Sequence, residues 1–249
     1  MKKFLPLLFV LLLCQTLSVR SQALIHPAIP KRIALTFDAC MTSGMIKRVE
    51  TGKDQPLFNA EIITYLQQEK IPATIFITGL WAKKYPAEVK AIAADPLFEI
   101  GNHSYGHKAF VTECYSLPIL AENEKETDLR KSQEILTRLT GKKPRLFRFP
   151  GGCYQPDDLK LLEKFGLKMV GWTFASGYAF NSNAEAIVQN VLEKAKTGAI
   201  VVFHLSGGRY APKSAEVIKT IVPELRKRGF EFVTVSRMMN YNFTSLKQN

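Results

Sequence analysis

Two of the four histidines of this chain, His103 and His107, lie four residues apart, directly after a short and mainly apolar segment at residues 96–100. Side chains four residues apart share a face when a segment turns like a helix, and both imidazoles could then bind one divalent metal ion. Nothing nearby completes a structural site with four protein ligands, so a metal here would be catalytic and open to water. A hydrogen-bonded loop without metal is the alternative for this pair taken alone.

Two acid–base candidates end apolar segments elsewhere in the chain. Asp38 follows the run 34–37, where it could serve as a general base toward water or simply cap a helix or turn. His204 ends the run 200–203 and could protonate a leaving group, or be a hydrogen-bonded histidine at the edge of the core.

A cation and a glycine turn follow another apolar segment. Arg148 lies just before Pro150-Gly151-Gly152, a turn that could direct the backbone N–H of Gly151 toward an oxyanion, or merely join a strand to a helix. Trp172 could form a wall of a sugar-binding pocket, although a core position is the ordinary alternative for a tryptophan.

These residues fall at the ends of predicted strands in a regular alternation of strands and helices. The period of apolar residues predicts strands at 32–38, 73–78, 98–101, 145–149, 168–173, 199–204 and 231–235. Helical spacing appears at 60–68, 122–139, 184–195 and 215–228. Alternation of this kind predicts an α/β fold with a parallel sheet, here a distorted (β/α) barrel of about seven strands. Chemistry in such barrels lies at the carboxyl ends of the strands, where these polar residues are found.

Together the motifs resemble those of the polysaccharide deacetylases, the family with the NodB homology domain (carbohydrate esterase family four). Thr36-Phe37-Asp38 is similar to its first motif, His103-Ser104-x-x-His107 to its second, Arg148-x-Pro150 to its third and Val202-Phe203-His204 to its last. The resemblance runs from about residue 32 to residue 236, in the family's order.

The resemblance implies a role for each of these residues. His103 and His107 would hold a divalent metal, commonly zinc, which makes water a usable nucleophile near neutral pH. Asp38, held ionised by Arg148, would take the proton of that water as it attacks an N-acetyl carbonyl. The metal and the N–H of Gly151 would stabilise the oxyanion, His204 would protonate the departing amine, and Trp172 would line the substrate pocket.

The chain departs from the family pattern at two positions. The family's first motif has a second aspartate that binds the metal, and Ala39 stands there. Its fourth motif has an aspartate that braces the arginine, and Gly171-Trp172-Thr173 offers none. Three consequences of Ala39 are open: a weaker metal held by two histidines with water and Asp38, a site without metal, or a thiolate ligand from Cys40. Cys40 lies one residue further on, where strand alternation could turn it to the opposite face.

Three cysteines remain if the first residues are removed: Cys40, Cys114 and Cys153. An odd number in an oxidising compartment predicts one disulfide and one free thiol, or three buried thiols. All three fall near the predicted site segments, so we prefer a disulfide that holds the loops over the site, with the pairing left open.

The N-terminus predicts export. Two lysines precede an apolar run of about eleven residues, which is long enough for a signal peptide and too short to span a bilayer. Cleavage after Ala23 would leave residues 24–249 as a single deacetylase domain, periplasmic or secreted; a lipoprotein anchored through Cys14 is the alternative. Loss of Lys2, Lys3 and Arg20 lowers the net charge from +12 to +9, which suits an anionic cell-wall polymer without requiring one. Scattered cations without a basic-aromatic motif disfavour nucleic acid.

The sequence therefore predicts an exported, metal-dependent deacetylase that hydrolyses N-acetyl groups of an amino-sugar polymer, peptidoglycan or another envelope polysaccharide. The alternatives are a non-catalytic carbohydrate-binding protein on the same fold and an O-acetyl polysaccharide esterase.

Overall fold

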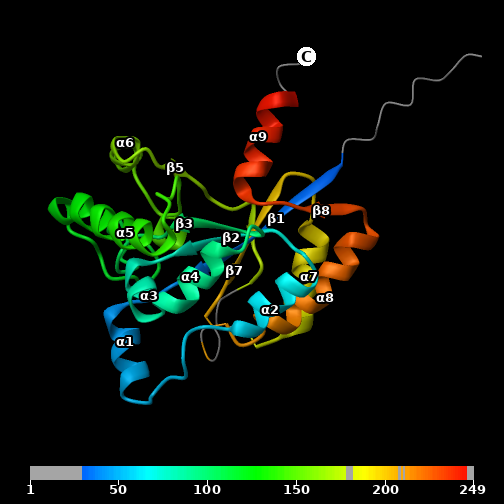
Figure 1. The fold of residues 1–249 in the computed structure, drawn as a ribbon, viewed down its shortest axis with the longest axis horizontal. Helices are drawn as coiled ribbons and strands as arrows, with labels where there is room; N and C mark the ends of the chain where they lie inside the picture. Colours follow the sequence, from blue (N-terminus) through cyan, green and yellow to red (C-terminus); the bar gives the residue numbers. More distant parts are fainter. Residues whose placement is uncertain (1–29, 178–181, 207–208, 210, 246–249) are drawn as a thin grey trace, which may run out of the picture.

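Eight parallel strands and their helices make up the part of the chain that the computed structural model describes, residues 30–177, 182–206, 209 and 211–245 (Figure 1). The strands are β1 (Lys31–Ala39), β2 (Ala73–Ile77), β3 (Phe98–Asn102), β4 (Leu146–Phe147), β5 (Lys168–Met169), β6 (Phe174–Ala175), β7 (Ala199–His204) and β8 (Phe230–Phe232). The α-helices are α1 (Ser43–Glu50), α2 (Ala60–Gln68), α3 (Gly79–Lys84), α4 (Pro86–Ala94), α5 (Lys125–Thr140), α6 (Pro156–Lys164), α7 (Ala184–Lys194), α8 (Ser214–Lys227) and α9 (Val235–Ser245). The predicted signal peptide, residues 1–23, lies outside the described residues.

The strands form one curved sheet in the order β5-β4-β3-β2-β1-β7-β6, and β8 pairs with the first residues of β1. All these pairings are parallel. Among the described residues no pairing joins β5 to β6, so the sheet is a half-barrel and not a closed one. The prediction of a distorted (β/α) barrel is confirmed.

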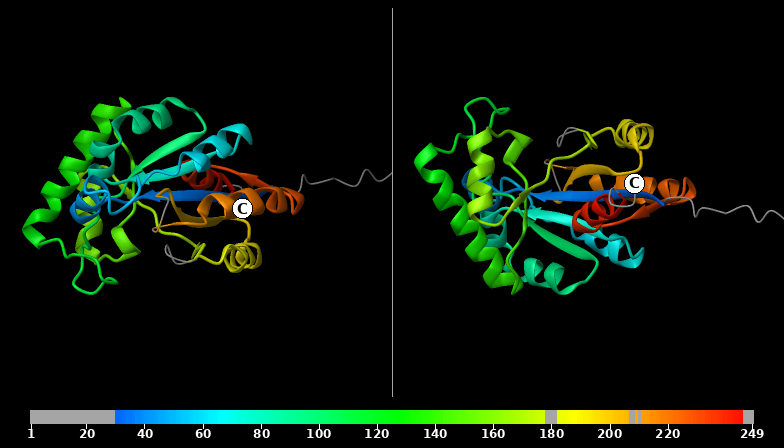
Figure 2. Two further views of the ribbon diagram at one scale, coloured as in Figure 1. Left: turned by 90° about the horizontal axis from the view of Figure 1, so that it is seen from below. Right: turned by 90° about the horizontal axis from the view of Figure 1, so that it is seen from above.

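Two groups of helices cover the outer face of the sheet (Figures 1 and 2). Helices α3, α4 and α5 pack together on one flank, and α8 packs between α2 and α7 on the other. The first turn of α2 is capped by Asn59, which accepts from the N–H of Glu61, and α3 is capped in the same way by Thr78. None of the helices in the described part of the chain is long and apolar enough to cross a membrane.

The period-two pattern of β1 divides its side chains between two environments. Ile33, Leu35, Phe37 and Ala39 belong to the main core beneath the helices. The alternate residues lie on the inner, concave side, where Ala34 joins a smaller cluster with Phe76. Asp38 lies on this inner side as well, because it is an even-numbered residue of the same strand. Strand alternation therefore directs its carboxylate into the half-barrel.

The predicted strand at residues 168–173 is wrong beyond its first two residues, and a separate strand, β6, begins after it. Lys168 and Met169 pair with β4 at one edge of the sheet, whereas Phe174 and Ala175 pair with β7 at the other. The intervening residues cross between the edges, and the carbonyls of Val170 and Gly171 accept hydrogen bonds from Arg148 at 3.3 and 3.0 Å. The buried guanidinium of Arg148 thus donates hydrogen bonds to two carbonyls that would pair with a neighbouring strand if the strand continued.

Candidate active site

The ion pair between Arg148 and Asp38 lies at the centre of the half-barrel. The Arg148 side chain is fully buried, and its Nη1 donates to Asp38 Oδ1 at 2.8 Å and to Thr36 Oγ1 at 2.9 Å. Burial alone would raise the pKa of Asp38, but Arg148, together with His103 and His204, outweighs it and lowers the pKa below its ordinary value. Asp38 is therefore ionised at neutral pH, as a base must be.

Arg148 is braced by the backbone instead of a second carboxylate. Its remaining nitrogens reach the carbonyls of Val170 and Gly171, and its guanidinium stacks 4.1 Å from the centre of the Phe76 ring. The family resemblance implies a bracing aspartate near Trp172, and the chain supplies these carbonyls where that aspartate is missing. The missing aspartate is thus compensated by local structure.

His103 is held in one tautomer beside the carboxylate. Its Nδ1 lies 2.8 Å from the carbonyl oxygen of Arg148, and because a carbonyl only accepts, Nδ1 carries the proton. Its Nε2 lies 3.7 Å from Asp38 Oδ2 and has no hydrogen-bond partner among the residues that the structure describes, although His103 is only 1% exposed. Burial lowers the pKa of His103 despite the attraction of Asp38, so the ring is neutral and its free Nε2 lone pair is available to a metal.

His107 reaches the same place through a loop and not through a helical turn. Ser104 and His107 both have left-handed backbone angles, φ +68° and +55°, and the N–H of His107 donates to Ser104 Oγ at 3.1 Å. The rings of His103 and His107 lie 4.9 Å apart between centroids. The helical geometry considered for this pair is thus wrong, yet the two imidazoles converge. Burial and the nearby His103 lower the pKa of His107 to about 3, so it too is neutral.

The loop that carries the histidines is held by polar residues that no sequence pattern indicated. The N–H of Tyr105 donates to Asp128 Oδ1 at 2.7 Å, and the N–H of Ser104 donates to Asn102 Oδ1 at 2.9 Å. Asn102 is in turn held by Ser132 and Gln133 of α5. Asp128 lies in a charged helix, where an acidic residue is usually solvated, so only the tertiary structure reveals its role.

Cys40 completes a cluster of possible metal ligands with the two histidines. The ligand atoms of Cys40, His103 and His107 all lie within 4.8 Å of one another, and Cys40 is a buried free thiol. Two imidazoles and one thiol are a set of nitrogen and sulfur donors that suits a divalent transition metal such as zinc, and His103 contributes an Nε2 that has no hydrogen-bond partner among the described residues. The residues present therefore fit the metal that the family resemblance implies.

His204 lies opposite Asp38 in the β1–β7 ladder. The N–H of the following residue, Leu205, donates to the Asp38 carbonyl at 3.0 Å, which fixes the ends of the two strands together. Burial lowers the pKa of His204, with Asp38 acting in the opposite direction, so the resting side chain is neutral. It can donate to a leaving group only after it has taken up a proton.

A disulfide joins the loops beside the site. Cys114 and Cys153 are bonded, with their Cα atoms 5.9 Å apart, and they tie the segment after His107 to the turn after Arg148. Gly151 and Gly152 have left-handed φ of +66° and +73°, and a Cβ on Gly152 would lie 2.5 Å from the half-buried ring of Trp172. The tryptophan thus packs directly on the glycine turn and borders the site.

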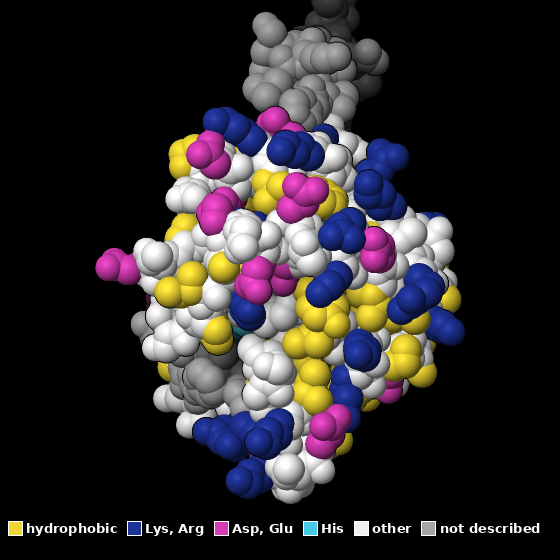
Figure 3. Space-filling view, turned by 90° about the vertical axis from the view of Figure 1, so that its left-hand side faces the viewer, with side chains coloured by type: hydrophobic (Ala, Val, Ile, Leu, Met, Phe, Trp, Pro, Cys, Tyr) yellow, Lys and Arg dark blue, Asp and Glu magenta, His cyan; other side chains and the backbone are white. Residues whose placement is uncertain are grey.

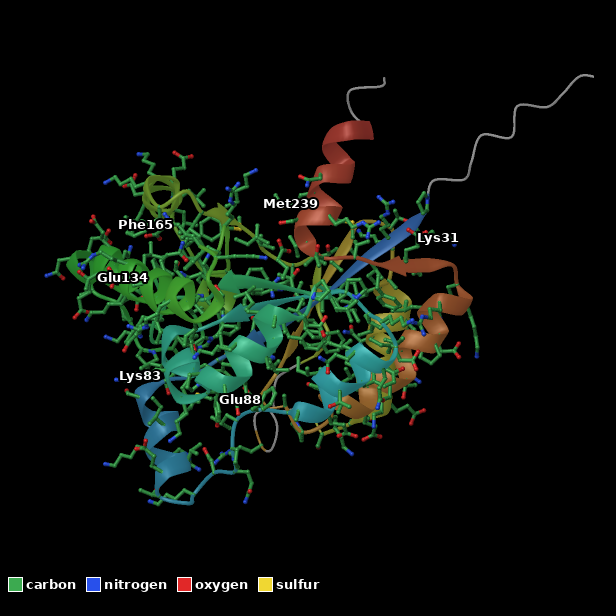
Figure 4. The ribbon with its side chains drawn as sticks, in the orientation of Figure 1. Lys31, Lys83, Glu88, Glu134, Phe165 and Met239 are labelled. Carbon is green, nitrogen blue, oxygen red and sulfur yellow. A yellow bond between two sulfur atoms is a disulfide. The ribbon has the colours of Figure 1, made fainter. Side chains whose placement is uncertain are left out.

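The carboxyl ends of the strands gather these residues at one end of the molecule. Figure 3 looks at that end, where a histidine surface is visible within a recess. A separate cavity of about 1050 Å³ lies elsewhere, between the start of α9 and the segment that follows α6. Phe165 and Met239, labelled in Figure 4, are on its two sides, and Lys142, Lys143, Arg145 and Lys168 line it. None of the acid–base candidates lines this cavity.

A curved parallel sheet with a carboxylate, an arginine and three histidines at the carboxyl ends of its strands defines a hydrolase-like site on a deacetylase fold. The family profile described as polysaccharide deacetylase matches residues 26–170, and the chain belongs to this family.

Two relatives from Bacillus cereus are both peptidoglycan-N-acetylglucosamine deacetylases. One is 31% identical over 206 residues, which cover 83% of this chain and 67% of the relative. The other is 30% identical over 213 residues, which cover 85% of this chain and 89% of the relative.

Solved structures share the fold over most of the chain. A peptidoglycan N-acetylglucosamine deacetylase in complex with 4-naphthalen-1-yl-N-oxidanyl-benzamide matches with a TM-score of 0.70 and 29% identity, over 85% of this chain and 89% of that one. A pseudoenzyme of carbohydrate esterase family four from Bacillus anthracis matches with a TM-score of 0.67 and 23% identity, over 86% of this chain and 66% of that one. The second likeness concerns the fold alone.

Proposed function

We propose that this protein is an exported, metal-dependent deacetylase that hydrolyses N-acetyl groups of an amino-sugar polymer and releases acetate. One observation carries the proposal: His103 Nε2, which is buried and has no hydrogen-bond partner in the described part of the chain, lies 3.7 Å from the ionised carboxylate of Asp38. A neutral donor with a free lone pair beside a carboxylate base is the arrangement that a metal-assisted hydrolysis needs.

The chain's own residues divide the work as follows. His103 and His107 would hold a divalent metal, which lowers the pKa of water and polarises the acetyl carbonyl when it is bound. Asp38 accepts the proton of the attacking water, and Arg148 keeps Asp38 ionised and fixes its position. The N–H of Gly151, in the turn that follows Arg148, donates to the developing oxyanion.

His204 completes the reaction by protonating the amine as the carbon–nitrogen bond breaks. Its pKa is lowered in the resting site, so it must acquire its proton during turnover. Asp38 is next to it in the β1–β7 register and is the base that removes a proton from water, so the proton has a short route from one to the other. Trp172 lines the sugar pocket above the glycine turn.

The substrate we favour is peptidoglycan or a related envelope polysaccharide. The two relatives named above act on N-acetylglucosamine of peptidoglycan, and the basic net charge of the chain suits an anionic polymer. The signal-like N-terminus supports export, to the periplasm or outside the cell. A disulfide in the described part of the chain is consistent with an oxidising compartment.

A non-catalytic carbohydrate-binding protein is the second candidate. Ala39 supports it, because the family resemblance implies a metal-binding aspartate at this position, and a pseudoenzyme of the same fold exists. An O-acetyl esterase using the same residues is the remaining alternative, and one solved structure of the same fold is an acetyl xylan esterase of Clostridium thermocellum in complex with cobalt.

Acetate release from peptidoglycan, N-acetylated chitin oligomers and O-acetylated xylan, each with and without chelator, separates the three candidates. We expect chelator-sensitive release from an N-acetylated polymer. Asp38→Asn and His204→Ala should each lower the rate by about 10²–10⁴ and leave the fold intact, as loss of a general acid or base does. Full activity in either variant contradicts the assignment, and binding without release from any substrate supports the non-catalytic candidate.

A further inference from the structure

Cys40 lies on the side of β1 that faces the site. Residues two apart in a strand share a face, so Cys40, which directly follows β1, lies on the same side as Asp38. Ala39 lies on the other side, is fully buried, and packs in the main core beneath the helices. The concern that Cys40 would turn away from the site is therefore wrong, since it is position 39 that faces away.

A second, independent observation points to a ligand at this place. His103 Nε2 is the buried side-chain atom without a hydrogen-bond partner among the described residues, and its tautomer is fixed by the Arg148 carbonyl. His103 belongs to a group with Cys40 and His107 in which each residue offers one ligand atom, and these atoms all lie within 4.8 Å of one another. An orphaned nitrogen of this kind costs free energy unless something binds it.

The structure excludes a disulfide between Cys40 and the other two cysteines of its described part. Cys114 and Cys153 are bonded to each other, so neither is available as a disulfide partner for Cys40.

We propose that Cys40 is the third protein ligand of the metal. It would replace the metal-binding aspartate that the family has at the position of Ala39. The resulting site has two imidazole nitrogens and one thiolate, a donor set that favours zinc or cobalt over magnesium, calcium or manganese. As the metal–sulfur bond forms, the S–H bond breaks and the proton passes to solvent. The proposal concerns the same site as the deacetylase function but stands without it, because a binding protein could hold the same metal.

The test is the absorption spectrum of the cobalt(II) protein. A thiolate bound to cobalt gives a charge-transfer band in the near ultraviolet, which nitrogen and oxygen ligands do not give. The full chain with Cys14→Ser has one thiol outside the disulfide, so a band in this protein must come from Cys40. We expect the band, together with a weaker cobalt and zinc affinity in Cys40→Ala. Loss of an outer-sphere partner already costs about 10–100-fold in metal affinity, so loss of a direct ligand should cost at least about 100-fold.

Cys40→Ser and the double variant Cys114→Ser/Cys153→Ser are the matched controls. The band should be absent in the first and present in the second. Circular dichroism of the metal-free forms shows whether each variant folds; if Cys40→Ala does not, the spectrum of the Cys14→Ser protein and that of Cys40→Ser still decide.

Cobalt binding without the band, or no cobalt binding at all, overturns the proposal. Acetate release is scored separately on the zinc-loaded protein. A band without acetate release supports Cys40 as a ligand and contradicts the deacetylase function. Acetate release without a band supports the deacetylase function and contradicts Cys40 as a ligand.

Discussion

The two sides of the site differ in whether their buried polar atoms have hydrogen-bond partners. On the arginine side, the guanidinium of Arg148 has acceptors for all its nitrogens in Thr36, Asp38 and two backbone carbonyls. On the histidine side, the lone pair of His103 Nε2 receives no hydrogen bond from any described residue. Asp38, the proposed base, is thus positioned by the protein alone, whereas the histidines proposed as metal ligands leave one buried nitrogen without a partner among the described residues.

The charges follow the same division. Arg148 lowers the pKa of Asp38, so the carboxylate is held as an anion. Burial lowers the pKa of both His103 and His107, so these rings are held neutral, which is the form that binds a cation. The comparison shows two neutral imidazoles beside the fixed negative charge of Asp38, an arrangement that suits the metal ion proposed for this site.

The largest expected effect comes from breaking the arginine side. Arg148→Met leaves Asp38 buried without its partner, which should lower the free energy of unfolding by about 3–5 kcal/mol and abolish acetate release. Urea unfolding measures the first and an acetate assay the second. Arg145→Met, an exposed neighbour, is the control and should stay within about 0.5 kcal/mol of the parent. If Arg148→Met is as stable as Arg145→Met, the ion pair does not organise the site.

Next in size is the disulfide, which ties the two sides together. Cys114→Ser/Cys153→Ser opens a loop of sequence separation 39 and should cost about 2–4 kcal/mol of stability. Because Gly151 and Trp172 lie beside this bridge, KM should rise more than kcat falls. Reduction of the parent protein should reproduce the effect, and reduction of the double variant should change nothing. An unchanged KM would show that the loops hold their places without the bridge.

Metal binding at the histidine side should raise the free energy of unfolding by about 3 kcal/mol. At a free zinc concentration 100 times Kd, the free energy of unfolding should rise by about 2.7 kcal/mol, and chelator should reverse it. His103→Ala should abolish this dependence on zinc, whereas His204→Ala should retain it, because His204 is assigned to proton transfer. Equal responses of the two variants in thermal or urea unfolding would contradict the division of roles.

The smallest effect concerns Asp128, which supports the histidine loop. Burial raises the pKa of Asp128 from its ordinary value to about 6, although the N–H groups of Tyr105 and Gly106 oppose the shift. A carboxyl whose folded pKa is raised binds its proton more tightly in the folded state, so its contribution to stability is present below about pH 4 and is lost as the pH rises through about 6.

Asp128→Asn removes this titration. The stability of the parent relative to the variant should therefore fall by about 2–3 kcal/mol between pH 4 and pH 7, measured by urea unfolding at each pH. Asp157→Asn, on an exposed side chain, is the control and should show no such fall over this window. A constant difference between parent and Asp128→Asn would mean that Asp128 titrates normally.

The sequence predicted the features that depend on local pattern. Asp38 and His204 were placed at strand ends because apolar runs stop there, and the structure pairs these two residues in adjacent strands. It could not predict contacts between distant segments. Arg148 reaches the carbonyls of Val170 and Gly171 only because the chain crosses the sheet at that point, and because of this crossing the strand predicted at 168–173 ends at Met169.

The pairing and orientation of the cysteines also could not be predicted from the sequence. Spacing left the pairing open, and the structure joins Cys114 to Cys153 and leaves Cys40 free. The orientation of Cys40 depended on which face of β1 meets the helices, and only the packing of Ala39 in the core settles that. Periodicity indicates which residues share a face of a strand. Packing of that face against the helices decides whether it lies in the main core.

The open half-barrel bears on how the protein avoids self-association. An unclosed sheet presents unpaired N–H and C=O groups at its two edges, which can recruit a strand of another molecule and start aggregation. Here the strands at the two ends of the order, β5 and β6, are only two residues long, and β8, which pairs with β1 alone among the described strands, has three residues. Each edge therefore offers too few backbone groups to template a second chain, and the sheet can remain open without the usual hazard of an open edge.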